Sequence, residues 1–172
     1  MNFKEYPDIF SNLGRVLYVG IDHDYEGLEE LAKRHGCVVG IDKYICDTSH
    51  HAEEREKILK EYPNLQIKQM DARKLKFPDR YFDGILFKQS LGFIGGEGKI
   101  KNEKDIQRAL DEAYRVLYQE GLVWIIYAPT DIINLTLDRM NLLLKSSGFE
   151  TIEDAENYRI CEKIKESAAD GI

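Results

Sequence analysis

The sequence predicts an α/β fold in which helices cover both faces of a mostly parallel β-sheet. Three observations lead to this prediction. Strand-like and helix-like segments alternate along most of the 172 residues, which is typical of parallel sheets. The segment LVWIIY is apolar enough to be covered on both faces. The last two strand-like segments follow each other without a helix, which adds an antiparallel strand at the end of the sheet.

The expected strands are short apolar runs bounded by turn-forming residues. Runs of this length fit buried strands, and the Gly, Pro, Asp and Asn residues beside them fit turns. CVVGID and LVWIIY are the clearest cases. FETIEDAENYRICEKIKES is interpreted as two strands joined by a short turn. In chain order, the expected strands are residues 15–20, 37–42, 65–70, 84–89, 122–127, 150–154 and 158–165.

Helices are expected where apolar residues recur on one face between these strands. Leu28, Leu31 and Ala32 share a face of the first helix, and Gly36 ends it. Asn102 can cap the helix that contains ALDEAYRVL, and Thr130 can cap the helix after the fifth strand. The expected helices are residues 26–35 and about 50–61, a third that follows Asn102 and reaches Leu117, and a fourth that follows Thr130 and reaches about Ser146.

A glycine-rich loop, SLGFIGGEGKIKN, connects the fourth strand to the next helix. Its four glycines predict that residues 90–102 form the most mobile internal segment. Because the loop follows a strand end, we expect it to overlie any pocket at that edge of the sheet. Phe93 and Ile94 would then be its apolar contacts with a ligand.

The composition favours one soluble globular domain over residues 1–172 and disfavours several other classes of protein. Hydrophobic residues make up 43% of the chain and charged residues 32%. Neither a membrane span nor a signal peptide is visible. Three widely spaced cysteines favour a cytoplasmic location. The net charge of −7 disfavours long nucleic acid as a partner, because phosphate binding needs a basic surface.

Histidine and cysteine are too sparse to predict a metal site. His50 and His51 lie four and five residues after Cys46, but no further ligands with suitable spacing accompany them. A solvated helix start is the favoured interpretation, and no bound metal is expected.

The ends of the predicted strands contain the candidate binding residues. Ligands in parallel α/β sheets bind at the carboxyl ends of the strands. Asp42 ends the second strand about 20 residues after the first glycine turn, where a carboxylate can accept hydrogen bonds from ribose hydroxyls. Asp71 and Ala72 end the third strand and could pair with an adenine ring. A structural role in a turn or helix cap stays open for both aspartates.

The first turn, in VLYVGIDHDYEG, departs from the usual nucleotide-binding pattern. Asp22 and Asp24 stand where further glycines would be expected. Glycine is used where φ is positive or where a Cβ would strike the ligand. Aspartate is among the few other residues that tolerate the left-handed conformation, so the turn can still form.

Several segments in combination resemble class I S-adenosylmethionine-dependent methyltransferases of the methyltransferase type 11-like group. They are VLYVG, VVGID, MDARKLKFPDRYFDGILF, ALDEAYRVLYQEGLVWIIY and LLLKSSGFE, and the resemblance covers nearly the whole chain. It implies a three-layer Rossmann-like fold with a seven-stranded, mostly parallel sheet and one antiparallel strand. The chain departs from the family at the first turn. Family members have an acidic residue before the first glycine, where this chain has Tyr18 or Val19, and glycines where it has Asp22 and Asp24.

The resemblance implies S-adenosyl-L-methionine as the cofactor and methyl transfer to an acceptor, either a small molecule or a protein. The ammonium and sulfonium groups of S-adenosylmethionine suit the acidic turn better than the pyrophosphate of a dinucleotide would. An NAD(P)-dependent oxidoreductase is therefore the weaker alternative. A non-catalytic methyltransferase-like scaffold or subunit is the other alternative. The acceptor, the catalytic residues, and any partner subunit or homodimer stay open. The candidate cofactor-binding residues are Gly20, Asp22, Asp42, Lys43, Asp71, Ala72 and Lys88.

Overall fold

The computed structural model describes residues 10–11, 13–22, 24–45, 48–94, 102–126, 136–155 and 158–164. The strands in these ranges are β1 (Arg15–Val19), β2 (Cys37–Asp42), β3 (Leu65–Gln69), β4 (Phe82–Lys88), β5 (Leu117–Ile126), β6 (Phe149–Asp154) and β7 (Tyr158–Lys163). The helices are α1 (Tyr25–Arg34), α2 (Ser49–Glu61), α3 (Leu91–Ile94), α4 (Glu103–Val116) and α5 (Leu137–Ser146).

Within the described residues the strands form a seven-stranded sheet in the order β3-β2-β1-β4-β5-β7-β6. The first five strands pair in parallel. β7 lies antiparallel to both β5 and β6, so it is the single antiparallel strand that the sequence predicted. The strand order reverses at β1, which pairs with β2 on one side and β4 on the other. This is the point in an open parallel sheet where ligands bind.

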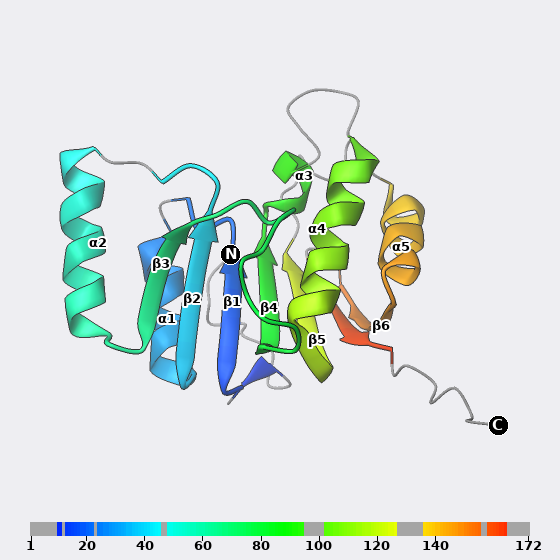
Figure 1. Cartoon of the computed structure of the whole chain (residues 1–172), viewed down its shortest axis with the longest axis horizontal. Helices are drawn as coiled ribbons and strands as arrows, with labels where there is room; N and C mark the ends of the chain where they lie inside the picture. The colour runs from blue at the N-terminus through cyan, green and yellow to red at the C-terminus, as the bar shows by residue number, and fades with distance from the viewer. Residues whose placement is uncertain are drawn as a thin grey trace.

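Alternating side chains of the central strands build a separate core on each face of the sheet. Leu17 and Val19 of β1 belong to the core that includes α4 and α5. Val16 and Tyr18 of the same strand belong to the core that includes α1. Figure 1 shows α4 in front of the sheet and α1 behind it. The three-layer arrangement follows from this two-residue period, because each face must be covered by a helix.

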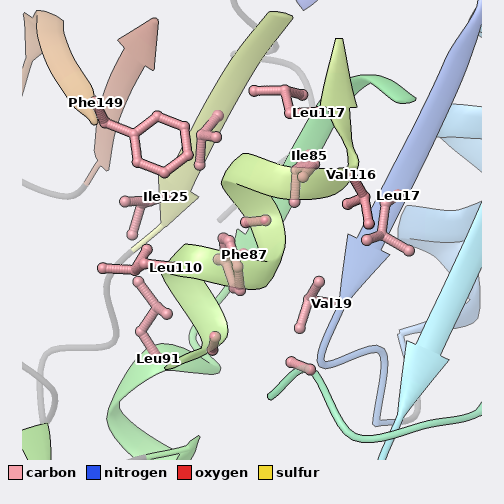
Figure 2. Close-up of a cluster of buried hydrophobic side chains, with 14 of the residues drawn as sticks. Leu17, Val19, Ile85, Phe87, Leu91, Leu110, Val116, Leu117, Ile125 and Phe149 are labelled. Atoms are coloured by element: carbon pink, nitrogen blue, oxygen red, sulfur yellow. The ribbon is translucent and has the colours of Figure 1, made fainter. Parts of the chain in front are cut away.

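The packing of α4 on the sheet explains why that helix forms where the sequence predicted. Its buried residues recur three and four positions apart, which places them on one face of the helix. In Figure 2, Leu110 and Val116 of α4 lie against Ile85, Phe87 and Ile125 of the strands. Full burial of each such side chain contributes about 1.5–3 kcal/mol to stability.

Most predicted boundaries lie within one or two residues of the observed ones, and the following differences affect the shape of the fold. Residues 91–94 form a short helix rather than loop, and residues 95–101 of the predicted mobile loop lie outside the described residues. β4 begins two residues earlier than predicted, at Phe82. β5 begins at Leu117 instead of residue 122, because Leu117 pairs with Phe82 before an irregularity in the ladder. The last helix begins after Thr136, whose side chain accepts the N–H of Arg139. Thr130, the predicted cap, lies outside the described residues.

Two further findings concern membrane-spanning helices and cysteines. No described helix is long and apolar enough to cross a membrane. Cys37 and Cys161 are free thiols, and burial raises the pKa of the Cys161 thiol to about 11.

Candidate functional site

A cavity of about 770 Å³ lies at the carboxyl ends of β1, β2, β3 and β4. These ends and the short helix α3 lie along the upper edge of the sheet in Figure 1. The volume falls in the range of small-molecule and cofactor sites. The structure brings all seven sequence-predicted residues to the wall of this cavity. They are Gly20, Asp22, Asp42, Lys43, Asp71, Ala72 and Lys88.

The turn after β1 is held in a conformation that requires glycine at its first position. Gly20 has φ +80°, and an added Cβ would clash with Ser90 Cβ at the end of β4. Its N–H donates to the Ile41 carbonyl at 2.9 Å, which ties the turn to β2. Asp22 has φ +41°. The prediction that aspartate can adopt the left-handed conformation in this turn is therefore confirmed.

Asp42 joins the end of β2 to two neighbouring loops. Its Oδ2 accepts the backbone N–H of Asp22 at 3.0 Å, and its Oδ1 accepts the N–H of Tyr44 at 3.0 Å. An ionised carboxylate has about four acceptor positions. These two bonds therefore leave it able to accept from a ligand, while they give it the structural role that the sequence left open.

Asp24 organises the wall of the cavity between β1 and β4. Its Oδ1 accepts the N–H of Gly27 at 3.2 Å and caps α1. Its Oδ2 accepts the hydroxyl of Tyr18 and forms an ion pair with Lys88. Burial, followed by the negative charge of Asp24, raises the pKa of Tyr18 well above its ordinary value. Tyr18 therefore stays protonated at neutral pH and donates its hydroxyl hydrogen to Asp24.

Asp71 is engaged mainly by its own loop. Both of its oxygens accept from the Arg73 guanidinium, with the shortest distance at 2.6 Å. This contact lowers the pKa of Asp71. Arg73 also binds Asp105 of α4 at 2.8 Å. Within the described residues the backbone N–H of neighbouring Ala72 has no hydrogen-bond acceptor. The Ala72 N–H is thus better placed than the Asp71 carboxylate to pair with a ligand.

Aromatic and charged side chains complete the cavity. Tyr44 and Phe93 are exposed over 73% and 65% of their surfaces although both line the cavity. The Lys43 ammonium lies 4.9 Å from the centre of the Tyr44 ring. Five aspartates and three cationic side chains line the cavity, so their formal charges sum to −2. Such a cavity favours a ligand that carries positive charge. The aspartates are Asp22, Asp24, Asp42, Asp71 and Asp105, and the cations are Lys43, Arg73 and Lys88.

The contacts that orient these residues could not be predicted from the sequence. Lys88 meets Asp24 across 64 positions of the chain, and Arg73 meets Asp105 across 32. Local spacing carries no signal for either contact. Phe93 and Ile94 do line the cavity, as expected. No metal-binding cluster of three or more His, Cys, Asp or Glu side chains is found in the described part of the chain. His50 and His51 each lie beside Glu54, whereas Cys46 lies outside the described residues.

Solved structures with this architecture are numerous, and their sequences are distant. The N-methyltransferase NodS from Bradyrhizobium japonicum WM9 has a TM-score of 0.68 at 12% identity, covering 90% of this chain and 88% of that one. NodS was also solved in complex with S-adenosylhomocysteine. An S-adenosylmethionine-dependent methyltransferase from Methanosarcina mazei has a TM-score of 0.67 at 17% identity, covering 94% and 99%. Identities this low show a common fold and leave the reaction open.

The cyclase SpnF illustrates why fold alone does not define the reaction. It has a TM-score of 0.64 at 21% identity over 84% of this chain, and the chain spans only 54% of the length of SpnF. No curated protein matches the chain significantly.

The family comparison is more direct than these structural ones. A model of the family described as "Methyltransferase domain" matches residues 24–125, which is more than half of the chain. The matched segment runs from the cap of α1 to the end of β5 and includes four of the seven strands. The chain therefore belongs to the methyltransferase domain family.

Proposed function

We propose that this chain binds S-adenosylmethionine in the cavity at the ends of β1–β4 and transfers its methyl group to a small-molecule or protein acceptor. The observation that carries the proposal is the convergence of Asp42, Ala72 and the Gly20 turn on one cavity of about 770 Å³. Membership of the methyltransferase domain family supports the choice of cofactor.

The residues of the cavity fit the chemical groups of this cofactor. The Ala72 N–H, which has no acceptor within the described residues, can donate to a ring nitrogen of adenine. Asp42 retains acceptor capacity for ribose hydroxyls. The excess of aspartates suits a cofactor with two cationic groups. A dinucleotide fits less well, because its pyrophosphate would lie beside Asp22 and Asp24.

The contribution of the protein to methyl transfer would be mainly one of position. Bound S-adenosylmethionine supplies a methyl group on a sulfonium, which a nucleophilic acceptor takes up by direct displacement. Alignment of two reactants in one site can itself supply much of the rate enhancement. Phe93 and Ile94 line the cavity after β4 and would contact an apolar part of the acceptor. A general base is needed only for an acceptor that must lose a proton.

Binding measurements test the proposal before any acceptor is known. Isothermal titration calorimetry of the purified protein with S-adenosylhomocysteine is expected to give saturable binding, and NAD is expected to give none. Binding of NAD alone would replace the proposal with the oxidoreductase alternative. Failure to bind S-adenosylhomocysteine or S-adenosylmethionine at millimolar concentration would favour the non-catalytic scaffold.

A further inference from the structure

We propose that the loop between β3 and β4 and the adjoining surface of β1 and β3 form a docking site for an acidic polypeptide segment. This basic surface consists of four cationic side chains and two aromatic rings, and none of the six residues lines the cavity. The inference therefore goes beyond the proposed function and does not depend on it. The residues are Arg15, Lys68, Lys74, Lys76, Phe77 and Tyr81.

Two of the cations and both rings form a row across the face of the sheet that carries α4. The Phe77 and Tyr81 rings pack against the core on that face and stack with their centres 5.9 Å apart. The Lys68 ammonium lies 5.5 Å from the centre of the Phe77 ring. The Arg15 guanidinium lies 4.9 Å from the centre of the Tyr81 ring. Lys68 belongs to β3 and Arg15 to β1, with β2 between them, so the row spans strands about 10 Å apart.

The other two cations project from the loop itself, which is held in place by α4. Figure 1 shows the chain between β3 and β4 passing in front of the sheet, on the same side as α4. Leu75 is buried in this loop, whereas Lys74 and Lys76 on either side of it are exposed. Arg115 of α4 donates to the carbonyls of Leu75 and Phe77. The surface is thus ordered before a partner binds, which lowers the entropy cost of association.

The charges of the basic surface are not compensated within the described part of the chain. The two carboxylates of the loop are occupied by other residues. Asp71 pairs with Arg73, and Asp79 pairs with Arg115. Uncompensated positive charge in a protein with a net charge of −7 is complementary to an anionic partner. The cations that form no ion pair with a described carboxylate are Arg15, Lys68, Lys74 and Lys76.

An acidic polypeptide fits this surface better than nucleic acid or an anionic membrane does. The negative charge of the rest of the protein repels a long phosphate backbone. Phe77 and Tyr81 are half-buried against the core and are not free to insert into lipid. In an extended polyproline II segment, residues three positions apart share a face and lie about 9 Å apart. Carboxylates at that spacing can reach both Lys68 and Arg15, and a side chain between them can contact the two rings.

Fluorescence anisotropy with a labelled oligomer of L-glutamate, about 20 residues long, tests the surface. Repulsion between its carboxylates keeps the probe extended, and it offers carboxylates at every spacing. Wild type is expected to bind the probe in low salt and to lose affinity as salt is added, because salt screens exposed charges. In the double variant Lys74→Glu and Lys76→Glu, affinity for the probe is expected to fall at least about tenfold. Lys68→Met, which removes one charge without reversing it, should cause a smaller loss.

A matched control separates the basic surface from the net charge of the protein. The double variant Lys104→Glu and Lys145→Glu makes the same change in net charge at exposed lysines of α4 and α5. It is expected to change affinity for the probe less than about threefold. Melting temperatures verify that the variants are folded. Affinity for S-adenosylhomocysteine is expected to be the same in wild type and in the variant at Lys74 and Lys76, because neither lysine lines the cavity.

Three outcomes would overturn the inference. The first is failure of wild type to bind the glutamate oligomer in low salt. The second is an equal loss of affinity in the two double variants, which would show that net charge alone governs binding. The third is tighter binding to double-stranded DNA or to vesicles containing phosphatidylserine than to the oligomer, with that binding lost in the variant at Lys74 and Lys76. None of these results bears on binding of S-adenosylhomocysteine, so the inference and the proposed function are tested separately.

Discussion

The carboxylate of Asp42 accepts the backbone N–H of Asp22 at 3.0 Å, across 20 positions of the chain. This bond joins the end of β2 to the turn that follows β1. The same carboxylate accepts the N–H of Tyr44 at 3.0 Å. Asp42 thus shapes two segments of the cavity wall, and its proposed contact with ribose would be added to these bonds. Ligand binding and local stability should therefore both depend on this carboxylate.

Replacement of Asp42 by alanine is expected to lower both ligand affinity and thermal stability. Loss of about 2–3 kcal/mol in binding corresponds to a fall of roughly 30- to 150-fold in affinity for S-adenosylhomocysteine. Asp42→Asn should give a smaller loss, because its amide oxygen can still accept one of the two backbone N–H groups. Calorimetric titration and melting temperatures measured on the same proteins check both effects.

Asp83→Ala is the matched control for this experiment. Asp83 also accepts a backbone N–H, that of Arg15 at 2.7 Å. It lies near the amino end of β4, away from the carboxyl end that borders the cavity. This variant is expected to lose stability and keep its ligand affinity. If Asp42→Ala behaves in the same way, Asp42 does not contact the ligand.

Gly20→Ala is expected to destabilise the protein through backbone strain and a steric clash. The residue would have to keep φ near +80°, and its Cβ would strike Ser90 Cβ. Strain of this kind costs about 1–3 kcal/mol, which urea unfolding can measure. Ser90→Gly removes one side of the clash, so in the double variant the losses should be less than additive. Fully additive losses would show that the two positions do not meet.

The fold was largely predictable because its signals are local. One-sided apolar patterns mark helices such as α4, and short apolar runs mark strands such as β2. The start of β5 was missed because it depends on a distant partner, the pairing of Leu117 with Phe82. Glu120 precedes residue 122, where the strand was expected to begin. It has φ +72° within β5, where the ladder with β4 is irregular.

The location of the candidate site was predictable, but its internal contacts were not. Parallel strands end at a common edge, so Gly20, Asp42 and Asp71 could be brought together from strand positions alone. The contacts of Asp24 with Tyr18 and Lys88 depend on side-chain directions in three dimensions. The sequence marked Asp24 only as a departure from glycine, whereas the structure gives it a helix cap and a counter-ion.

His35 is expected to make stability depend on pH below neutrality. The residue is 5% exposed, and its Nδ1–H donates to the Leu13 carbonyl at 3.1 Å. Burial lowers its pKa below the ordinary value of 6.5. As pH falls through 6.5, the unfolded chain binds a proton that the folded protein does not, so folded stability is lost. The loss levels off below the folded pKa.

Comparison with His35→Gln isolates this contribution, because the other titrating groups are common to both proteins. Between about pH 7.5 and about pH 5.5, the melting temperature of wild type is expected to fall more than that of the variant. Equal slopes for the two proteins would mean that His35 titrates alike in the folded and unfolded states.

Arg115 is expected to hold the segment between β3 and β4 in place. Its guanidinium donates to the carbonyls of Leu75 and Phe77 at 2.9 and 2.8 Å. It also binds Glu112 of the same helix, whose Oε2 accepts the Leu75 N–H at 2.7 Å. These bonds hold the loop between β3 and β4 against α4, and this loop contains Ala72, which lines the cavity.

Arg115→Lys keeps the positive charge but cannot reproduce the planar set of donors. We expect a loss of about 1–3 kcal/mol in the free energy of unfolding, measured with urea. Arg115 also lowers the pKa of Glu112. The stability that this lowered pKa contributes is fully present at pH values above 4.5, the ordinary pKa of a glutamate. It is lost as the pH falls through the lowered pKa of Glu112. The difference in the free energy of unfolding between wild type and Arg115→Lys should therefore become smaller at acidic pH. Arg108→Lys, on the same helix but with a side chain 68% exposed, is the control and should change little. A loss in Arg108→Lys equal to that in Arg115→Lys would assign the effect to helix propensity instead of the loop.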